Sequence, residues 1–254
     1  MTAAPPPRAE FGYRRRMAAP HPLDRPIWTA LTTRQAHLAE VCSPARRFDP
    51  AFAPFADAED MSRASLEAIH ALLNPGEPAV LFTPEPVDAP ACLQTLMAAT
   101  GEQMTGTPAD ARVREPLVAL TGDDAPAMRA LVALTNPGPF GPRTHELGEF
   151  LGIRLDGRLV AMAGERMKPG NYTEMTAVCV HPDFRGRGYA QALLAAVSRR
   201  ILARGEIPFL HVFSDNAAAV ALYRRQGMSI RRRLHVTVLG RAGDAMTAPP
   251  VHAG

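Results

Sequence analysis

Residues 174–239 alternate between strand and helix patterns, and this alternation constrains the fold more than any other feature of the chain. Glu174–Val180 is rich in β-branched residues, which indicates a strand, and Gly188–Ala203 carries its leucines, valine and isoleucine along one helix face. The alternation continues with a strand, a helix and a final strand at Pro208–Phe213, Asn216–Gln226 and Ile230–Leu239. A helix between two strands returns the chain in the same direction, so the pattern predicts a parallel strand pair within a mixed sheet, an α/β (α+β) fold.

The segment before it adds further strands and one helix. Phe150–Leu155 and Leu159–Glu165 flank an Asp-Gly pair, which supplies the positive φ angles of a two-residue hairpin turn. Leu117–Leu120 is a further strand candidate. Asp123 or Asp124 can cap a helix that Asn136-Pro137-Gly138 ends. These elements extend the same sheet.

The N-terminal part gives weaker signals. Ser62 can cap a helix that stops at Asn74-Pro75-Gly76, Ala79–Thr83 indicates a buried strand, and Cys92–Ala99 a helix. Residues 106–110 are typical of a linker. We therefore expect four parts: a disordered tail at 1–26, an N-terminal α/β domain at 27–112, a second domain at 113–240 and a flexible tail at 241–254.

Composition excludes several classes of protein. Of the 254 residues 46% are hydrophobic, and the formal net charge is only +3, too weak a field to indicate nucleic acid. No run approaches the about 18 apolar residues of a membrane span, and no signal-peptide pattern opens the chain. Three widely spaced cysteines suggest neither disulfides nor a metal cluster. We expect a cytoplasmic protein, monomeric or homodimeric, that binds no metal, membrane or nucleic acid.

A glycine-containing loop joins the Glu174–Val180 strand to the helix that follows. Gly186 and Gly188 allow a ligand to approach the backbone closely, and the helix N-terminus favours negative charge. The loop matches neither a P-loop nor a Rossmann fingerprint. It indicates a site for an anion such as a pyrophosphate, although two glycines can also serve a tight turn alone.

Two motifs in this region resemble the GCN5-related N-acetyltransferases (GNAT), and within them the FR47-like group. Arg185-Gly186-Arg187-Gly188-Tyr189-Ala190 is similar to the family's cofactor motif R/Q-x-x-G-x-G/A, and Val178, Val180 and Pro182 precede it as V-x-V-x-P. A second motif, N-x-x-A-x-x-L-Y-x-x-x-G, is met by Asn216, Ala219, Leu222, Tyr223 and Gly227. The resemblance covers about residues 117–239. It implies the GNAT acyl-CoA N-acyltransferase fold, with the N-terminal part as an α/β extension or a degenerate second copy.

The resemblance also implies a cofactor site for acetyl-CoA (CoA) as co-substrate. Two neighbouring parallel strands would splay apart, and the pantetheine arm would pair with the backbone of Val178, Cys179 and Val180 as an added strand. The cofactor motif, Arg185 to Ala190, would take the pyrophosphate through main-chain amides. Asn216 would contact the pantetheine arm, cap its helix, or do both. The Cys179 side chain is better explained as a small buried hydrophobe than as a nucleophile.

The catalytic residues that the resemblance implies are Tyr223, His211 and Glu174. Tyr223 takes the place of the phenol that protonates the departing thiolate, although it can also be a packing aromatic. Glu174 and His211 lie where different relatives carry a glutamate base, and ordered water is a third alternative. Strand alternation puts Glu174 on one face with Val178 and Val180 and relates His211 to Phe209 and Phe213. Two alternatives remain open: His211 can be a core histidine, and Glu174 can form a salt bridge at the rim of the sheet.

We therefore expect an N-acetyltransferase that acts on a primary amine of a small molecule, amino acid or peptide in a ternary complex. A non-catalytic CoA-binding sensor is the alternative. A nucleic-acid binder that uses Arg14–Arg16 and Arg231–Arg233 ranks last, because the sequence lacks a helix-turn-helix, zinc or RNA-binding motif. Arg231–Arg233 is more typical of a solvated strand edge than of a site for an acidic substrate or the CoA 3′-phosphate. Loops at 136–148 and 166–173 are expected to face the acceptor.

Overall fold

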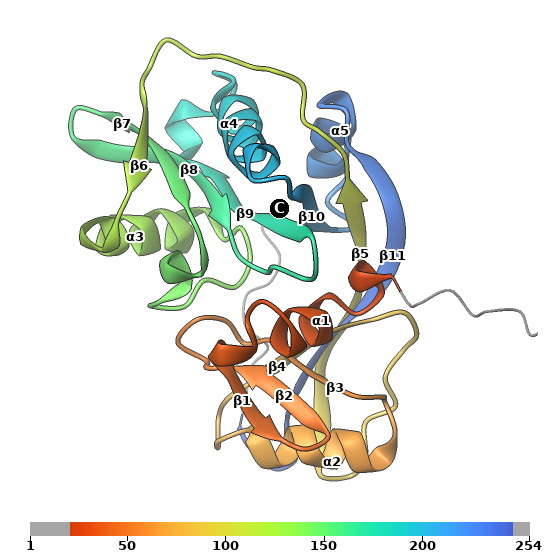
Figure 1. The fold of residues 1–254 in the computed structure, drawn as a ribbon. Coiled ribbons are helices and arrows are strands. Elements are labelled where there is room, and N and C mark those ends of the chain that lie inside the picture. The colour runs from red at the N-terminus through yellow and green to blue at the C-terminus, as the bar shows by residue number, and fades with distance from the viewer. Residues whose placement is uncertain (1–20, 246–254) are drawn as a thin grey trace, which may run out of the picture.

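The computed structural model of the protein describes residues 21–245 (Figure 1). Its main feature is an 8-stranded mixed sheet in the order β4-β11-β5-β10-β9-β8-β7-β6. In chain order these strands are β4 (Ala79–Thr83), β5 (Leu93–Thr105), β6 (Leu117–Leu120), β7 (Phe150–Leu155), β8 (Arg158–Glu165), β9 (Tyr172–Val180), β10 (Ile207–Phe213) and β11 (Ser229–Arg241). A smaller antiparallel sheet contains β1 (Ala39–Cys42), β2 (Ala45–Phe48) and β3 (Ala56–Ala58).

The helices cover both faces of the main sheet. They are α1 (Pro26–Thr32), α2 (Arg63–Leu72), α3 (Ala125–Thr135), α4 (Tyr189–Ala203) and α5 (Ala217–Arg225), with short 3-10 turns at Pro22–Asp24, Ala36–Leu38, Gly122–Asp124, Thr144–Leu147 and Pro182–Phe184. Leu193 and Leu194 of α4 pack with Leu210 on one face. Met128 of α3 packs with Cys179 on the other. The mixed α/β fold is therefore confirmed, and every strand and helix expected within residues 117–239 is present within about two residues.

The helix expected at Cys92–Ala99 is wrong, because this segment begins the long strand β5. β5 pairs with β11 from Leu93↔Arg241 to Thr105↔Ser229 and with β10 over Gly101–Thr105. Leucine, methionine and alanine favour a helix locally, but propensity is weak against the row of interstrand hydrogen bonds that this segment forms with β11. The strands β1 to β3 and helix α1 were not expected from the sequence.

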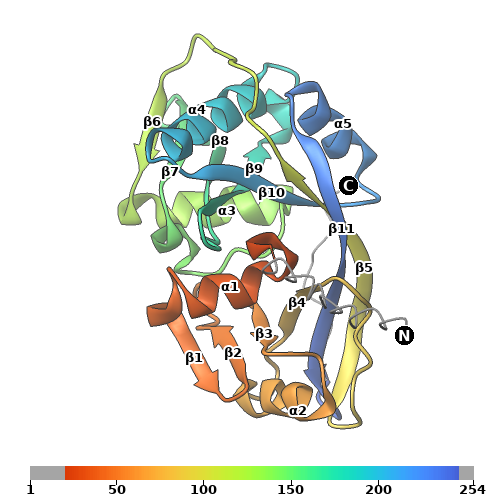
Figure 2. The same cartoon turned by 45° about the vertical axis from the view of Figure 1, so that its right-hand side comes forward.

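The main sheet crosses the expected boundary between residues 112 and 113. β5 lies before the boundary and is inserted between β10 and β11, which follow it (Figure 2). β4 also pairs with the distal half of β11. The division into two domains and the degenerate second copy stay predictions, but the N-terminal part and the main sheet share strands.

Residues 21–26 are part of the fold, which corrects the expected disordered tail over that range. The Leu23 side chain is fully buried, and the Asp24 carboxylate pairs with Arg231 at 2.6 Å and Arg232 at 3.1 Å. Arg233 pairs with Glu102 while its side chain stays 65% exposed, so Arg231–Arg233 form ion pairs at a surface that is still partly solvated. The rest of the tail, with Arg14–Arg16, and residues 246–254 lie outside the described residues.

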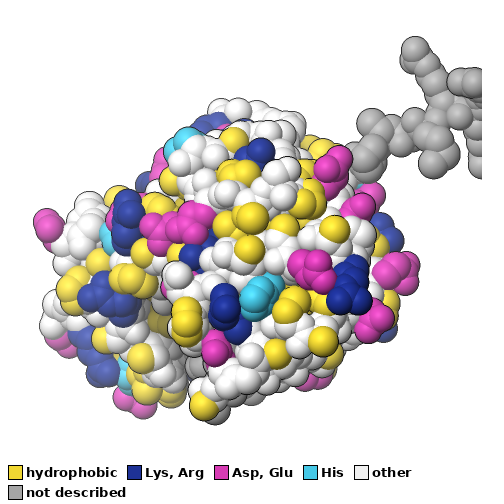
Figure 3. All heavy atoms as spheres, turned by 90° about the horizontal axis from the view of Figure 1, so that it is seen from below, with side chains coloured by type: hydrophobic (Ala, Val, Ile, Leu, Met, Phe, Trp, Pro, Cys, Tyr) yellow, Lys and Arg dark blue, Asp and Glu magenta, His cyan; other side chains and the backbone are white. Residues whose placement is uncertain are grey.

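Charge is mixed over the face seen from below in Figure 3, where acidic and basic side chains are interspersed. Within residues 21–245 no helix combines the length and the apolar character needed to cross a bilayer. The same part of the chain contains no cluster of three His, Cys, Asp or Glu side chains suited to a metal ion.

Candidate active site

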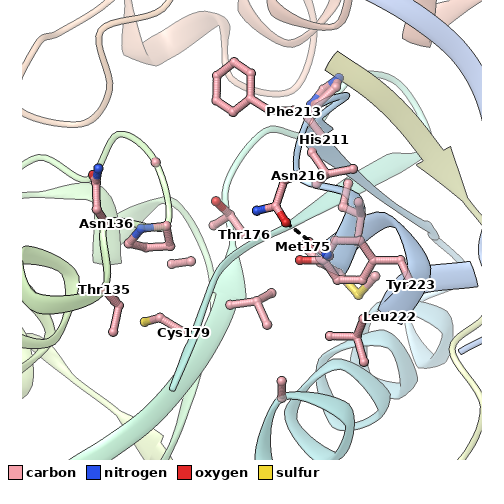
Figure 4. A pocket seen from close by; sticks show the side chains of 18 of the residues that line it. Thr135, Asn136, Met175, Thr176, Cys179, His211, Phe213, Asn216, Leu222 and Tyr223 are labelled. Carbon is pink, nitrogen blue, oxygen red and sulfur yellow. Dashed lines mark hydrogen bonds between the residues drawn. The ribbon is translucent and has the colours of Figure 1, made fainter. Parts of the chain in front are cut away.

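The parallel strands β9 and β10 separate after three paired positions. They pair at Tyr172↔Ile207, Thr173↔Pro208 and Glu174↔Phe209, and beyond this point each strand keeps only its other neighbour. A cavity of about 650 Å³ opens between the separated halves. Its walls also include the loop after β9, helix α5 and residues 135–139 (Figure 4). The diverging strands therefore present unpaired backbone groups to a cavity large enough for a cofactor arm.

A β-bulge interrupts β9 beside the cavity. The register against β8 shifts between Met162↔Cys179 and Gly164↔Thr176, and Ala177 adopts a φ of 50°. This left-handed conformation costs an alanine about 1–2 kcal/mol, so the surrounding sheet must stabilise it. The bulge turns backbone groups of β9 out of the ladder toward the cavity.

The bulge also reverses the expected side-chain alternation. Met175, Val178 and Val180 pack together beneath α4, whereas Ala177 and Cys179 pack on the α3 side. Glu174 therefore faces away from Val178 and Val180, which corrects the expectation that the three share a face. One inserted residue changes the parity of everything beyond it.

The glycine loop is open toward the cavity. Gly186 and Gly188 both have a φ of +79°, and Gly188 is the N-cap of α4. Arg185, Gly186, Gly188, Tyr189 and Ala190 line the cavity, and Arg187 instead lies over the Phe184 ring at 4.9 Å. The first N–H groups of a helix have no acceptor within it, so this end of α4 offers backbone donors to an anion.

Helix α5 carries Asn216 and Tyr223 into the same cavity. The Asn216 side chain accepts a hydrogen bond from the Ala219 N–H at 3.0 Å, so it caps the helix as expected. Tyr223 lies across the pocket from Cys179 in Figure 4. Burial, with a smaller contribution from the nearby Cys179, raises the pKa of Tyr223 to about 12, so its hydroxyl stays protonated at neutral pH.

The Cys179 thiol is shielded from solvent beside Thr135 (Figure 4). Burial raises the pKa of Cys179 to about 12, and hydrogen bonds to Thr135 and the Met162 backbone only partly oppose this rise. A neutral thiol is a poor nucleophile. This agrees with the expected role of Cys179 as a buried hydrophobe whose backbone, not its side chain, faces a ligand.

Glu174 and His211 are brought together, and Arg166 joins them. The Arg166 guanidinium donates to both Glu174 carboxylate oxygens at 2.8 and 3.0 Å, and His211 Nδ1 lies 2.8 Å from the Glu174 carboxylate. Burial would raise the pKa of Glu174, but Arg166 and His211 outweigh it and lower that pKa to about 2. His211 lines the cavity, whereas Glu174 lies behind it. Arg166 was not predicted from the sequence, because it directly follows β8 and lies outside both family motifs.

Gln103 fixes the tautomer of His211. Its side-chain oxygen accepts from Arg231 at 2.9 Å, and its amide nitrogen donates to the Leu23 carbonyl at 2.9 Å and lies 3.1 Å from His211 Nε2. An amide N–H needs an acceptor, so Nε2 carries the lone pair and Nδ1–H donates to Glu174. His211 is thus oriented by one partner at each ring nitrogen, Glu174 at Nδ1 and Gln103 at Nε2. Gln103 was not predicted either, because it lies between the helix expected at Cys92–Ala99 and the linker expected at residues 106–110.

Comparisons with known proteins agree with this geometry. A family model described as the acetyltransferase (GNAT) family matches residues 125–228. A crystal structure of a GNAT-family protein from Novosphingobium aromaticivorans is similar to this chain at 39% identity, with a TM-score of 0.80 over 87% of this chain and 99% of the other. A GCN5-related N-acetyltransferase from Kribbella flavida shares the fold, at 18% identity and a TM-score of 0.54 over 85% and 92% of the two chains.

Curated relatives match over shorter stretches. N-alpha-acetyltransferase RimI of Mycobacterium tuberculosis is 39% identical over 34% of this chain and 57% of its own length. A mycothiol acetyltransferase of Saccharomonospora viridis is 36% identical over 32% of this chain and 29% of its own length. The chain thus matches less than two thirds of either relative. The FR47-like assignment stays a prediction. The structural match along almost the whole chain agrees with the diverging strand pair and the open glycine loop, and the chain belongs to the GNAT acetyltransferase family.

Proposed function

We propose that this protein is an acetyl-CoA-dependent N-acetyltransferase that acts on a primary amine of a small molecule, amino acid or peptide. The observation that carries the proposal is the cavity between β9 and β10, which meets the open N-terminus of α4 at one end. Unpaired strand backbone suits the amides of a pantetheine arm, and the helix N–H groups suit a pyrophosphate. The cytoplasmic location and the monomeric or dimeric state expected from the sequence stay predictions.

The cofactor-binding roles follow from these positions. The backbone of Val178 and Val180 would hold the pantetheine arm, and residues 185–190 would hold the pyrophosphate through main-chain N–H groups. Acetyl-CoA supplies the activated acetyl group as a thioester. Backbone N–H groups that the bulge at Ala177 removes from the ladder would be the donors for the oxyanion that develops on the thioester carbonyl.

The transfer then needs one proton acceptor and one donor. The amine lone pair attacks the carbonyl carbon, a C–N bond forms and the C–S bond breaks. The Tyr223 hydroxyl protonates the departing thiolate. Its high pKa keeps this proton available at neutral pH, and the tyrosinate regains a proton from solvent after release.

For the proton acceptor we propose His211, with Glu174 as the group that orients it. Glu174 is a weak base because its pKa is lowered to about 2, and it lies behind His211 as seen from the cavity. The lone pair of His211 Nε2 accepts a hydrogen bond from Gln103, so the amine must displace that donor to reach it. Accepting the amine proton there replaces the hydrogen bond from Gln103.

The test begins with calorimetry of CoA and acetyl-CoA binding, followed by an amine screen that detects the free thiol product. Tyr223→Phe should bind acetyl-CoA as the wild type does and should lose about 10²–10⁴ in kcat, the usual contribution of a positioned acid. Unchanged turnover would remove Tyr223 from this role. Absence of CoA binding would refute the proposed function, and binding without turnover of any amine would instead support a sensor.

A further inference from the structure

We infer that the acceptor is a primary amine with a compact apolar body, aromatic or branched aliphatic, that carries neither a carboxylate nor a second cation. The inference rests on the proposed function and adds the substrate class. It comes from a part of the cavity that the cofactor motifs do not account for. The N-terminal part of the chain lines this part together with strands β10 and β11.

The cavity continues past His211 to an apolar wall. Its residues come from the segment before β3, from β4, from the end of β10 and from β11; they are Phe55, Val80, Phe82, Phe213, Leu234 and Val236. We call this set the apolar wall. Phe82 and Val236 are register partners across β4 and β11, so they stand side by side. The wall is built on paired strands and is therefore rigid.

The apolar wall begins directly at the proposed base. The Phe82 ring centroid lies 4.5 Å from that of His211, and the Phe55 ring lies 5.4 Å from Phe82. An amine nitrogen placed at His211 thus directs the rest of its molecule onto these rings. Burying a phenyl-sized group there removes apolar surface from water on both partners.

The charges around the cavity exclude other acceptor classes. Among its lining residues in the described part of the chain there is no aspartate or glutamate, so a second ammonium group of a diamine would find no carboxylate to pair with there. Arg166 is the cation nearest to the apolar wall, and its guanidinium lies 4.6 Å over the Phe55 ring. Glu174 already binds it through both carboxylate oxygens, so an amino-acid carboxylate finds no unpaired cation there.

A long acyl chain is the competing occupant of the same space. The position of the apolar wall favours the amine, because the wall adjoins His211. The backbone sites proposed for pantetheine are at Val178 and Val180, whose side chains pack beneath α4. If the amine occupies this space, kcat/KM should rise with the apolar bulk of the amine. If the acyl chain occupies it, kcat/KM should rise with the length of the acyl group.

The experiment compares amines and acyl donors with one thiol readout. With acetyl-CoA, 2-phenylethylamine should exceed both 1,4-diaminobutane and phenylalanine in kcat/KM by about tenfold to hundredfold, the value of burying one such side chain. Higher kcat/KM for the diamine or the amino acid would overturn the inference and leave the proposed function standing. A preference for octanoyl-CoA over acetyl-CoA, together with indifference to the amine body, would also overturn it.

Two matched variants locate the effect. Val236→Thr places a hydroxyl of equal size in the apolar wall and should lower kcat/KM for 2-phenylethylamine about three- to tenfold, with acetyl-CoA binding unchanged. Val238→Thr is the control, because Val238 is equally buried one pleat further along β11 but does not line the cavity. Equal loss in both variants would overturn the inference. If neither CoA binding nor turnover of any amine is found in the wild type, the proposed function fails first and the inference with it.

Discussion

Glu174→Gln is the substitution that tests the electrostatics of the site most directly. Glu174 is 0% exposed and Arg166 7% exposed, and the two form a bidentate pair. Glutamine keeps the size of the side chain but removes the charge, which leaves the Arg166 guanidinium buried without a counter-charge. Removing one partner of a buried pair costs about 3–5 kcal/mol of unfolding free energy.

The pH dependence of stability gives a second, independent signature of the same pair. The folded-state pKa of Glu174 is about 2, below the ordinary value of 4.5, so the unfolded chain binds a proton more readily than the folded one. The stabilisation is therefore fully present above pH 4.5 and is lost as pH falls toward 2. The difference between the two pKa values corresponds to about 3 kcal/mol. Glu174→Gln should lack this part of the acid dependence.

The assay is urea unfolding followed by circular dichroism at several pH values. Glu67→Gln is the control, because it removes an exposed ion pair with Arg63 and should leave the curves unchanged. If Glu174→Gln does not fold, Glu174→Gln with Arg166→Met should restore folding, since removing both charges leaves neither unpaired. A Glu174→Gln protein with wild-type stability at pH 7 and the wild-type acid slope would refute the reasoning.

Two further predictions concern the cofactor loop and the base. Gly188→Ala puts a side chain at a φ of +79°, so it should destabilise the fold by about 1–2 kcal/mol and weaken CoA binding in calorimetry; wild-type affinity would show that the loop does not grip the cofactor. His211→Gln keeps a donor for Glu174 but no basic nitrogen, so kcat should fall about 10²–10⁴ at neutral pH while CoA binding persists. Undiminished turnover in the activity assay would identify water as the base.

The sheet from β6 to β11 could be predicted because each element carries a local signal. The Asp-Gly turn, the Asn216 cap and the alternation after Glu174 depend only on neighbouring residues. The motifs at 185–190 and 216–227 then named the family. The cavity itself followed from the family resemblance and not from any pattern of polarity.

What could not be predicted depends on distant partners. β5 is a strand because it pairs with β11 along its length and with β10 over Gly101–Thr105, and no residue between 93 and 99 signals the pairing with β11. The bulge at Ala177 could not be predicted from the sequence either, since alanine has no preference for a positive φ. That one residue decided on which face Glu174 lies, so an alternation argument across it had to fail.

The contact between His211 and Gln103 places the N-terminal part of the chain beside the proposed base. The two residues are direct register partners across β10 and β5, so their side chains emerge on the same face of the sheet. Gln103 precedes the boundary expected at residue 112, and His211 follows it. The strand that fixes the tautomer of the proposed base and the strand that supplies Val80 and Phe82 to the apolar wall therefore come from the same N-terminal part. In the proposed mechanism, acceptor choice and proton acceptance would therefore both depend on strands, β4 and β5, that lie outside the segment that the family motifs cover.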